Sequence, residues 1–176
     1  PGEVAMAEAA FEFLVERVHG FLAAKRSAPG TGLADELVAA AGRGEINEQE
    51  ALATIVMLYG LGHMDVGYTI ASGLLVFAER SDVYDAFRAR PDVREQIVNE
   101  VIRLDPPELS FYRTTTEDVT IRGVEIPAGS SVRFMIGAAN RDPEVFENPD
   151  DFDFLRPTIH SRNLSFGLGP HGCAGQ

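Results

Sequence analysis

The spacing of apolar residues predicts helices over the first part of the chain. One helical face carries six large apolar side chains: Phe11, Leu14, Val15, Val18, Phe21 and Leu22. Ser27, Pro29 and Gly30 follow this run, and residues of these types end helices. A second, shorter helix is expected over 33–41, because two glycines follow it closely.

An almost uninterrupted apolar stretch then runs from Ala51 to Ala78. Asn47 and Glu50 stand three residues apart in front of it, which is the spacing of a capping box at a helix N-terminus. A helix of this length could cross a bilayer. The ionisable residues His63 and Asp65 lie near its middle, however, and an ionisable group in lipid is costly. The pattern favours a long helix buried inside a soluble protein, and the membrane-spanning helix is the alternative.

Two further helices are predicted downstream of this stretch. Ser81 is expected to cap a helix that runs to Ala89, because a serine side chain accepts a hydrogen bond from the first turn. Pro91 breaks the helical run, and the next helix is expected to begin near Val93. The Asp-Pro-Pro sequence at 105–107 ends that helix.

The pattern then changes to short strands. The segments 119–121 and 124–126 flank the Arg-Gly dipeptide at 122–123, which predicts a hairpin, and a further strand is expected over 131–135. Short helical turns are expected over 138–146. The predicted fold class is mainly α with a small β component.

Composition places the chain among globular proteins. Of its 176 residues, 45% are hydrophobic and 24% are charged, and this length suffices for one domain with its own core. We expect residues 1–176 to belong to a single domain. One cysteine excludes a disulfide framework. The formal net charge of −12 argues against a nucleic acid or an anionic membrane as partner.

The cysteine of this chain lies in a loop rich in glycine. Cys173 stands in the segment 165–175, and glycines let backbone N–H groups approach its sulfur closely. A thiolate in such a loop can bind a metal at one open coordination position, while the N–H groups tune its basicity.

Four other kinds of loop compete with this interpretation. A phosphate-binding loop ends in Gly-Lys-Ser or Gly-Lys-Thr, which does not occur here. A structural zinc site needs four ligands, whereas the chain has one cysteine and four scattered histidines. A Cys–His nucleophile pair would use His171, two residues from Cys173, without an evident orienting partner. A buried free cysteine that acts as a small hydrophobe is the ordinary alternative.

The loop resembles the haem-ligand signature of the cytochrome P-450 family, F-G-x-G-x-H-x-C-x-G. The fixed positions all agree: Phe166, Gly167, Gly169, His171, Cys173 and Gly175. The resemblance implies that Cys173 binds the iron of haem b (iron protoporphyrin IX) and that His171 holds a haem propionate. It also makes Phe166, Gly167 and Gly169 cofactor-binding residues of the same loop.

Three further segments carry the resemblance. The run E-V-I-R-L-D-P-P from Glu100 onward matches the second signature of the family, in which Glu100 and Arg103 stand three residues apart. Arg156, in F-D-F-L-R-P, matches its third member. The resemblance implies that these three residues form a buried lock behind the haem loop, a structural role. Arg113 stands where the family uses an arginine to hold a haem propionate, and a guanidinium suits a carboxylate.

The order of these markers is the order of the family. In this order, the apolar stretch 51–78 stands at the position of the long helix that, in the family, crosses the distal face of the haem. The resemblance therefore implies that residues 1–176 are the C-terminal part of a single cytochrome P-450 domain. It implies the fold of the family in incomplete form, with the N-terminal half and the helix after the cysteine loop missing. Because both parts help to enclose the haem, the isolated chain is expected to retain haem poorly.

Two positions depart from the pattern of the family. The distal helix of the family usually carries an acid followed by an alcohol, which deliver protons to dioxygen, whereas here Met64 and Asp65 stand at these positions. Asp65 is one helix position, about 100°, from the usual acid. It is a candidate for a relocated proton donor, for a contact to a polar substrate, or for a residue that caps the groove.

The second departure lies before the cysteine loop. Asn163 stands where many relatives have a histidine that binds a propionate, and an asparagine donates a hydrogen bond without a charge. His160 is three residues out of register and is expected at the surface.

The resemblance implies a cytoplasmic haem-thiolate oxidoreductase. The first hypothesis is a monooxygenase that inserts one oxygen atom from dioxygen into a small organic or natural-product substrate of secondary metabolism. Its electrons would come from NAD(P)H through a ferredoxin or a flavodoxin. The missing acid–alcohol pair keeps open a second hypothesis of oxidative coupling, desaturation or a peroxide-driven reaction. A third hypothesis is a non-catalytic helper protein, and the intact Cys173 counts against it.

Overall fold

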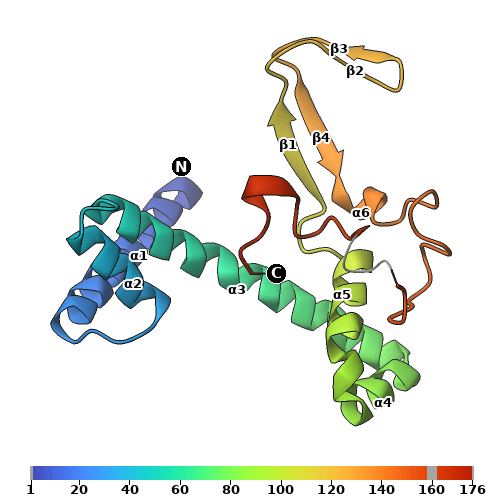
Figure 1. Cartoon of the computed structure of the whole chain (residues 1–176), viewed down its shortest axis with the longest axis horizontal. Coiled ribbons are helices and arrows are strands. Elements are labelled where there is room, and N and C mark those ends of the chain that lie inside the picture. Colours follow the sequence, from blue (N-terminus) through green and yellow to red (C-terminus); the bar gives the residue numbers. More distant parts are fainter. Residues whose placement is uncertain (1, 158–161, 176) are drawn as a thin grey trace. The chain divides into compact units, whose positions relative to one another are not determined.

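The computed structural model describes residues 2–157 and 162–175 (Figure 1). The chain divides into two compact units, Pro1–Met64 and Asp65–Gln176, and the long helix α3 contributes residues to both. Each unit has its own interior. The expectation that the chain belongs to a single domain stays a prediction, and His160 lies outside the described residues.

The first unit consists of helices. Its elements are α1 (Gly2–Ser27), α2 (Leu33–Gly42) and the beginning of α3 (Glu48–Glu79). Val18 and Leu22 on the predicted apolar face of α1 are buried, and their burial stabilises the unit. Phe11 and Phe21 on the same face are exposed, so the described chain covers this face only in part.

A capping box begins α3, as the sequence predicts. The Glu50 backbone N–H donates to Asn47 Oδ1 at 2.8 Å, and the Asn47 N–H donates to Glu50 Oε2 at 2.7 Å. Two of the N–H groups that a helix N-terminus leaves without partners are satisfied in this way.

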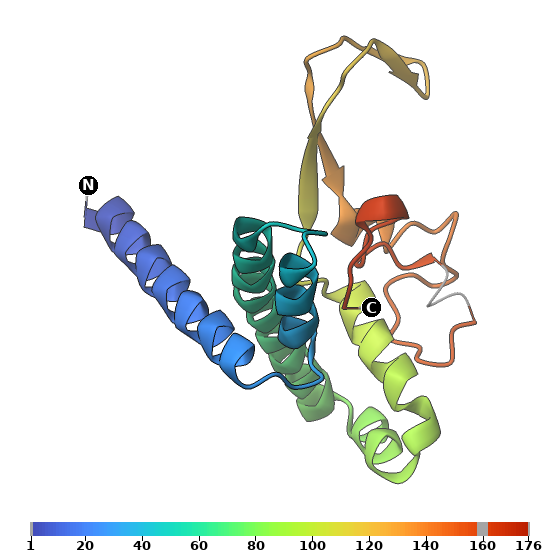
Figure 2. The ribbon, with the colours of Figure 1, turned by 60° about the vertical axis from the view of Figure 1, so that its left-hand side comes forward.

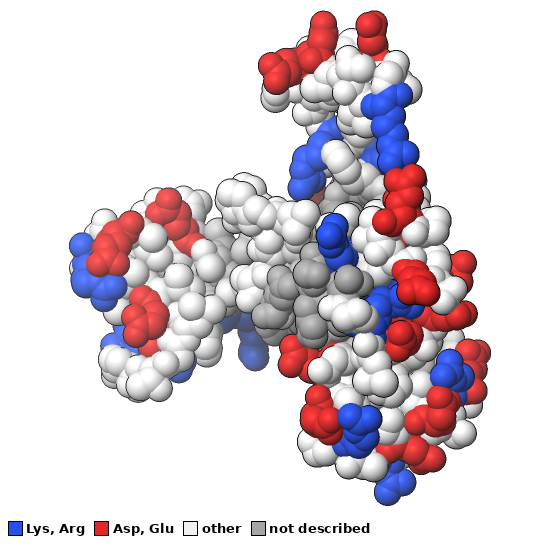
Figure 3. All heavy atoms as spheres, turned by 45° about the vertical axis from the view of Figure 1, so that its right-hand side comes forward, with Lys and Arg blue, Asp and Glu red and all other residues white. Residues whose placement is uncertain are grey.

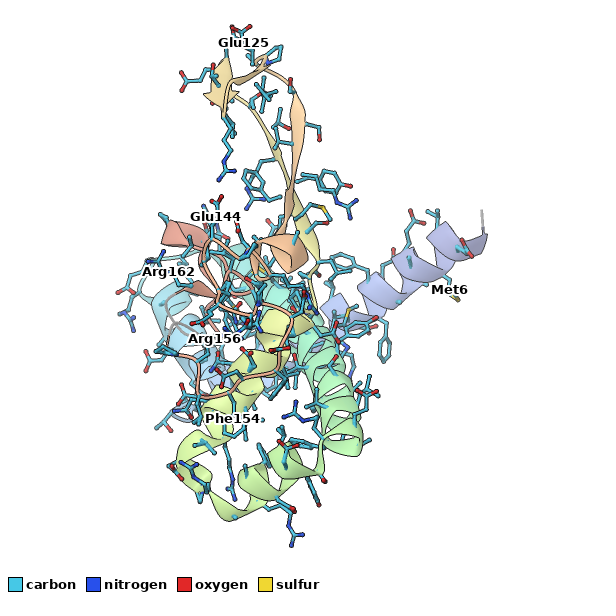
Figure 4. All side chains as sticks on the ribbon, turned by 90° about the vertical axis from the view of Figure 1, so that its right-hand side faces the viewer. Met6, Glu125, Glu144, Phe154, Arg156 and Arg162 are labelled. Carbon is cyan, nitrogen blue, oxygen red and sulfur yellow. The ribbon has the colours of Figure 1, made fainter. Side chains whose placement is uncertain are left out.

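The helices of the second unit pack around one small apolar core. They are α4 (Ser81–Ala89), the short η1 (Pro91–Val93) and α5 (Arg94–Leu104). Val83, Val93 and Ile97 form the core, and Phe152 and Phe154 from a later segment pack against it. Figure 4 labels Phe154. This core therefore holds α4 and α5 to a segment some fifty residues away in the chain.

The predicted cap of α4 is wrong. Arg80 occupies the N-cap position without a side-chain hydrogen bond to the helix, and Ser81 is already the first helical residue. The Arg80 guanidinium instead bonds to Asp82 at 2.8 and 2.9 Å. Both side chains of this pair are exposed, and Figure 3 shows acidic and basic side chains interspersed on the surface.

Two small antiparallel sheets follow α5 (Figures 1 and 2). The predicted hairpin is confirmed: β2 (Val119–Ile121) pairs with β3 (Val124–Ile126), and positive φ angles at Arg122 and Gly123 form the turn. The predicted strand over 131–135 is β4 (Ser131–Met135), and it pairs with β1 (Ser110–Thr114), which the sequence did not indicate.

The chain then passes through the short helix α6 (Ile136–Ala139) and a wrapping segment, residues 140–157, to the 3-10 turn η2 (Gly169–His171). The wrapping segment consists of turns and bends, as expected for its first part, and it buries Phe146 almost completely. Because it returns to α5 and α4, it brings distant polar groups to one place.

Helix α3 differs from the expectation of a buried helix. It is long and apolar enough to cross a membrane by length and composition, yet none of its most apolar window is buried in the described structure. Nine large apolar residues of α3 are exposed: Met57, Tyr59, Leu61, Met64, Val66, Tyr68, Ile70, Leu74 and Leu75. The described part of the chain does not cover this apolar surface, and it is therefore open to other contacts.

Candidate functional site

A buried ion pair lies on one face of α5. Glu100 and Arg103 stand three residues apart, and both side chains are completely buried. The guanidinium meets the carboxylate through two parallel hydrogen bonds, from Nε to Oε2 and from Nη2 to Oε1, each 2.7 Å long. This bidentate geometry offsets part of the cost of burying two charges.

The remaining N–H groups of Arg103 bond to backbone carbonyls of the wrapping segment. Nη1 donates to the carbonyls of Asn140 at 2.8 Å and Pro149 at 2.7 Å, and Nη2 donates to Asp151 at 3.1 Å. Together with the two bonds to Glu100, all five N–H donors of the guanidinium are used. Its carbon also lies 5.1 Å from the ring centroid of Phe146. Arg103 therefore holds the wrapping segment against α5.

Arg156 joins the same group from the end of the wrapping segment (Figure 4). Its side chain is nearly buried, and its Nε donates to Glu100 Oε1 at 3.4 Å. Its other donors reach the carbonyls of Glu147, Asn148 and Asp151. The structure thus brings the three predicted charged residues Glu100, Arg103 and Arg156 together, and we refer to them as the charged cluster.

The cysteine loop is a sequence of tight turns. The Cys173 N–H donates to the Phe166 carbonyl at 2.7 Å, and the Gly167 N–H donates to the Leu164 carbonyl at 2.9 Å. Positive φ angles of 70° at Gly167 and 78° at Gly169 allow this path, and residues with a Cβ rarely adopt them. The loop therefore needs its glycines at these two positions.

The sulfur of Cys173 lies at the surface of this loop. The thiol is free and exposed, and Sγ accepts a hydrogen bond from the Gly175 N–H at 3.3 Å. The backbone N–H of Gly175 is thus directed at the sulfur. Exposure differs from the expectation for a cysteine that serves only as a small buried hydrophobe.

These residues fit a haem better than a metal ion held by the protein alone. The described residues bring together no group of three or more His, Cys, Asp or Glu side chains. A metal at Cys173 would thus take a single soft ligand from the described chain. Haem iron needs only such an axial ligand from one side, because the porphyrin supplies four others.

The other predicted site residues lie apart from the charged cluster. His171 is exposed within η2 of the loop. Arg113 is exposed on β1 and donates to the Tyr112 carbonyl at 2.8 Å, and Asp65 is exposed on α3. Among the described residues, neither Arg113 nor Asp65 forms a hydrogen bond or an ion pair with the cysteine loop.

The side chain of Asn163 forms hydrogen bonds within the protein. Its side chain is buried, its Oδ1 accepts the Ser165 N–H at 2.9 Å, and its Nδ2 donates to the Asn99 carbonyl at 3.4 Å. The residue thus holds its own segment to α5.

Sequence reasoning missed Asn140. This residue is completely buried between the charged cluster and the segment before the loop. Its only signal in the sequence is a polar residue directly after the apolar run of β4 and α6, and many surface positions share that signal.

Comparison with known proteins identifies the family. The family described as Cytochrome P450 matches residues 92–176, which include the charged cluster and the cysteine loop. A relative in Sinorhizobium fredii, described as a cytochrome P450 BJ-1 homolog, is 34% identical over 94% of this chain. The chain belongs to the cytochrome P450 family.

Solved P450 structures show the same fold. The P450 monooxygenase TamI, with tirandamycin C bound, superposes with a TM-score of 0.83 at 31% identity and covers 97% of this chain. CxnD, a P450 described as forming a C–S bond in chuangxinmycin biosynthesis, gives a TM-score of 0.80 at 32% identity over 95% of this chain. The predicted fold class, mainly α with a small β component, is confirmed.

The chain corresponds to part of these P450s. It spans 42% of the relative in Sinorhizobium fredii, 44% of TamI and 41% of CxnD. The P450 fold described here is accordingly incomplete.

Proposed function

We propose that the protein to which this chain belongs is a haem-thiolate oxidoreductase, and in the first place a monooxygenase. One observation carries the proposal: Cys173 presents an exposed sulfur at the surface of a glycine-rich turn, and a backbone N–H donates to that sulfur. The similarity to TamI, which is described as a P450 monooxygenase, supports it.

The residues of the loop would hold haem b. Cys173 would bind the iron, and Phe166, Gly167 and Gly169 shape the turn that presents its sulfur. His171 and Arg113 would hold the propionates, since both side chains are exposed and have N–H groups that can donate to a carboxylate. When bound, haem with a thiolate ligand supplies the electron density that favours cleavage of the O–O bond.

The charged cluster has a structural role in this proposal. Glu100, Arg103 and Arg156 are buried and bond mainly to each other and to backbone carbonyls, so none of them is placed to contact a substrate. They keep the wrapping segment folded onto α5.

Asp65 is the residue proposed for proton delivery. Its carboxylate can hold and release a proton, whereas the thioether of Met64, at the position of the usual acid, cannot. Asp65 is exposed on α3, where a bound substrate or water can reach it.

Substrate, electron source and location follow the same proposal. A small organic substrate of secondary metabolism is supported by TamI, which binds tirandamycin C, and by CxnD, which acts in chuangxinmycin biosynthesis. Electrons from NAD(P)H would arrive through a ferredoxin or a flavodoxin in the cytoplasm of a bacterium.

The test is an absorption spectrum of the whole protein, loaded with haem, reduced and exposed to carbon monoxide. We expect a strongly red-shifted Soret band in the wild type and in an Ala174→Ser control, and loss of this band in Cys173→Ala. An unshifted band in the wild type, typical of a neutral axial ligand, would overturn the proposal.

A second candidate is haem-thiolate chemistry without oxygen insertion, such as oxidative coupling. Met64 at the position of the usual acid favours it, and so does the similarity to CxnD, described as forming a C–S bond. Analysis of the product with ¹⁸O₂ separates the two. The monooxygenase is supported if the product carries the label and its yield per electron falls in Asp65→Asn but not in Asp85→Asn. A product without the label supports the second candidate.

A further inference from the structure

Asn140 lies at the junction of three parts of the fold. It follows α6, its side chain is completely buried, and its backbone carbonyl accepts a hydrogen bond from Arg103 Nη1 at 2.8 Å. The backbone of Asn140 is therefore bound to the charged cluster, and its side chain is free to bond elsewhere.

The carboxamide of Asn140 connects α5 to the segment before the cysteine loop. Oδ1 accepts the Leu164 N–H at 2.9 Å. Nδ2 lies 3.2 Å from the Arg103 carbonyl, 3.1 Å from Asn163 Oδ1 and 2.9 Å from Ser165 Oγ. Every polar atom of this buried side chain thus has a partner, as a buried amide requires.

The segment 163–165 makes further bonds to backbone carbonyls of α5. Ser165 Oγ donates to the Ile102 carbonyl at 3.0 Å, and Asn163 Nδ2 donates to the Asn99 carbonyl at 3.4 Å. The last carbonyls of a helix lack partners within the helix. Here Asn140 and Ser165 supply them, so the same groups cap α5 and fix the segment 163–165.

The fixed segment in turn carries the turn that presents Cys173. The Gly167 N–H donates to the Leu164 carbonyl, and the Cys173 N–H donates to the Phe166 carbonyl. A shift of Leu164 and Ser165 on α5 would therefore move the backbone of Cys173.

We propose that Asn140 is a positioning residue for Cys173: its carboxamide sets the place of the segment 163–165 on α5, and through it the place of the thiolate that binds the haem iron. This inference rests on the proposed function. Both halves of the amide are needed, because Oδ1 accepts an N–H while Nδ2 faces three oxygens.

The decisive variant is Asn140→Asp in the haem-loaded whole protein. A carboxylate of the same shape would face the three oxygen atoms without a donor, and repulsion would displace the segment 163–165. We expect about tenfold weaker haem binding and partial conversion of the red-shifted Soret band, in the reduced protein with carbon monoxide, to the unshifted band. Asn47→Asp, which makes the same change at the cap of α3, is the matched control and keeps the wild-type values.

The outcomes separate the inference from the proposed function. A wild type without the red-shifted band overturns the proposed function, and the inference falls with it. The inference alone is overturned if the wild type has this band and Asn140→Asp folds with unchanged haem affinity and spectrum. In that case Asn140 would have a structural role that leaves the bond between the sulfur and the iron intact. If Asn140→Asp does not fold, Ser165→Ala decides, since it removes only the bonds of the Ser165 hydroxyl to Ile102 and Asn140. An unchanged band and reduction potential in Ser165→Ala would then refute the inference.

Discussion

At the scale of single residues, the arginines of the charged cluster depend on the shape of the guanidinium as well as on its charge. Arg103 uses five N–H donors in fixed directions, to Glu100 and to three backbone carbonyls. A lysine has three donors on one atom and cannot reach these acceptors together.

Arg103→Lys is therefore expected to lower the free energy of unfolding by about 3 kcal/mol or more, because it breaks the bidentate pair with the buried carboxylate of Glu100 and leaves at least two buried acceptors without a donor. Denaturation by urea measures this change. Arg88→Lys on the exposed face of α4 is the control, and it is expected to change stability by less than about 0.5 kcal/mol. Equal effects of the two substitutions would contradict the role of Arg103.

Asp35 shows a second residue whose surroundings change its chemistry. Its carboxylate accepts the N–H groups of Gly30 at 2.8 Å and Gly32 at 3.0 Å, and Lys25 Nζ lies 3.1 Å away. The hydrogen bond from Gly30 is the largest cause that lowers the pKa of Asp35, and burial opposes it in part. The charged form thus holds the loop between α1 and α2.

This lowered pKa predicts acid sensitivity of the first unit. In the unfolded chain Asp35 has its ordinary pKa of about 3.9, whereas its pKa in the folded chain is lower. The stabilisation is therefore complete above about pH 5, and it is lost as pH falls through the folded value. Between neutral pH and about pH 3, the free energy of unfolding is expected to depend less steeply on pH in Asp35→Asn than in the wild type. Glu36→Gln removes one charge nearby and serves as control. Parallel pH curves for wild type and Asp35→Asn would contradict this prediction.

At the scale of elements, the beginning of α3 is specified by a short local pattern. Asn47 and Glu50 each bond to the backbone N–H of the other. Both bonds lie between residues three apart, so they form as soon as the first turn forms and require no other part of the protein.

Asn47→Ala is expected to cost about 1 kcal/mol and to fray the first turn of α3. Amide hydrogen exchange over 48–52 measures the fraying, and Gln49→Ala, between the two capping residues, is the control. Faster exchange in the control than in Asn47→Ala would argue against the capping box.

At the scale of the whole molecule, the apolar surface of α3 has no cover within the described chain. On α3, Tyr59 is 63% exposed and Ile70 is 58% exposed. The P450s to which this chain is similar are more than twice as long as the chain. Exposed apolar patches of this kind mark surfaces that contact other protein or a ligand.

The isolated chain of 176 residues is accordingly expected to bind an apolar dye such as ANS with several-fold higher fluorescence than the whole protein, and to lose added haem on gel filtration. The control is Leu61→Ser with Leu74→Ser on α3, which is expected to lower the dye signal of the isolated chain. Retention of haem by the isolated chain would contradict the prediction.

The sequence by itself determined the features that depend on neighbours in the chain. The helices α1 to α5, the box of Asn47 and Glu50 and the turn at Arg122 and Gly123 arise from interactions over two to four residues, so their patterns can be read directly. The cysteine loop was equally readable, because its glycines occur within ten residues.

Only the tertiary structure decided the features that join distant segments. Strand β1 has three residues of types common in strands, Phe111, Tyr112 and Thr114, but so short a segment becomes a strand only through its pairing with β4. The resemblance implies that Arg156 lies close to Glu100, but it does not predict the hydrogen bonds from Arg156 to carbonyls of the wrapping segment. Asn140 was invisible in the sequence because its partners lie 23 to 37 residues away, and a buried polar residue is recognised only when those partners are in place.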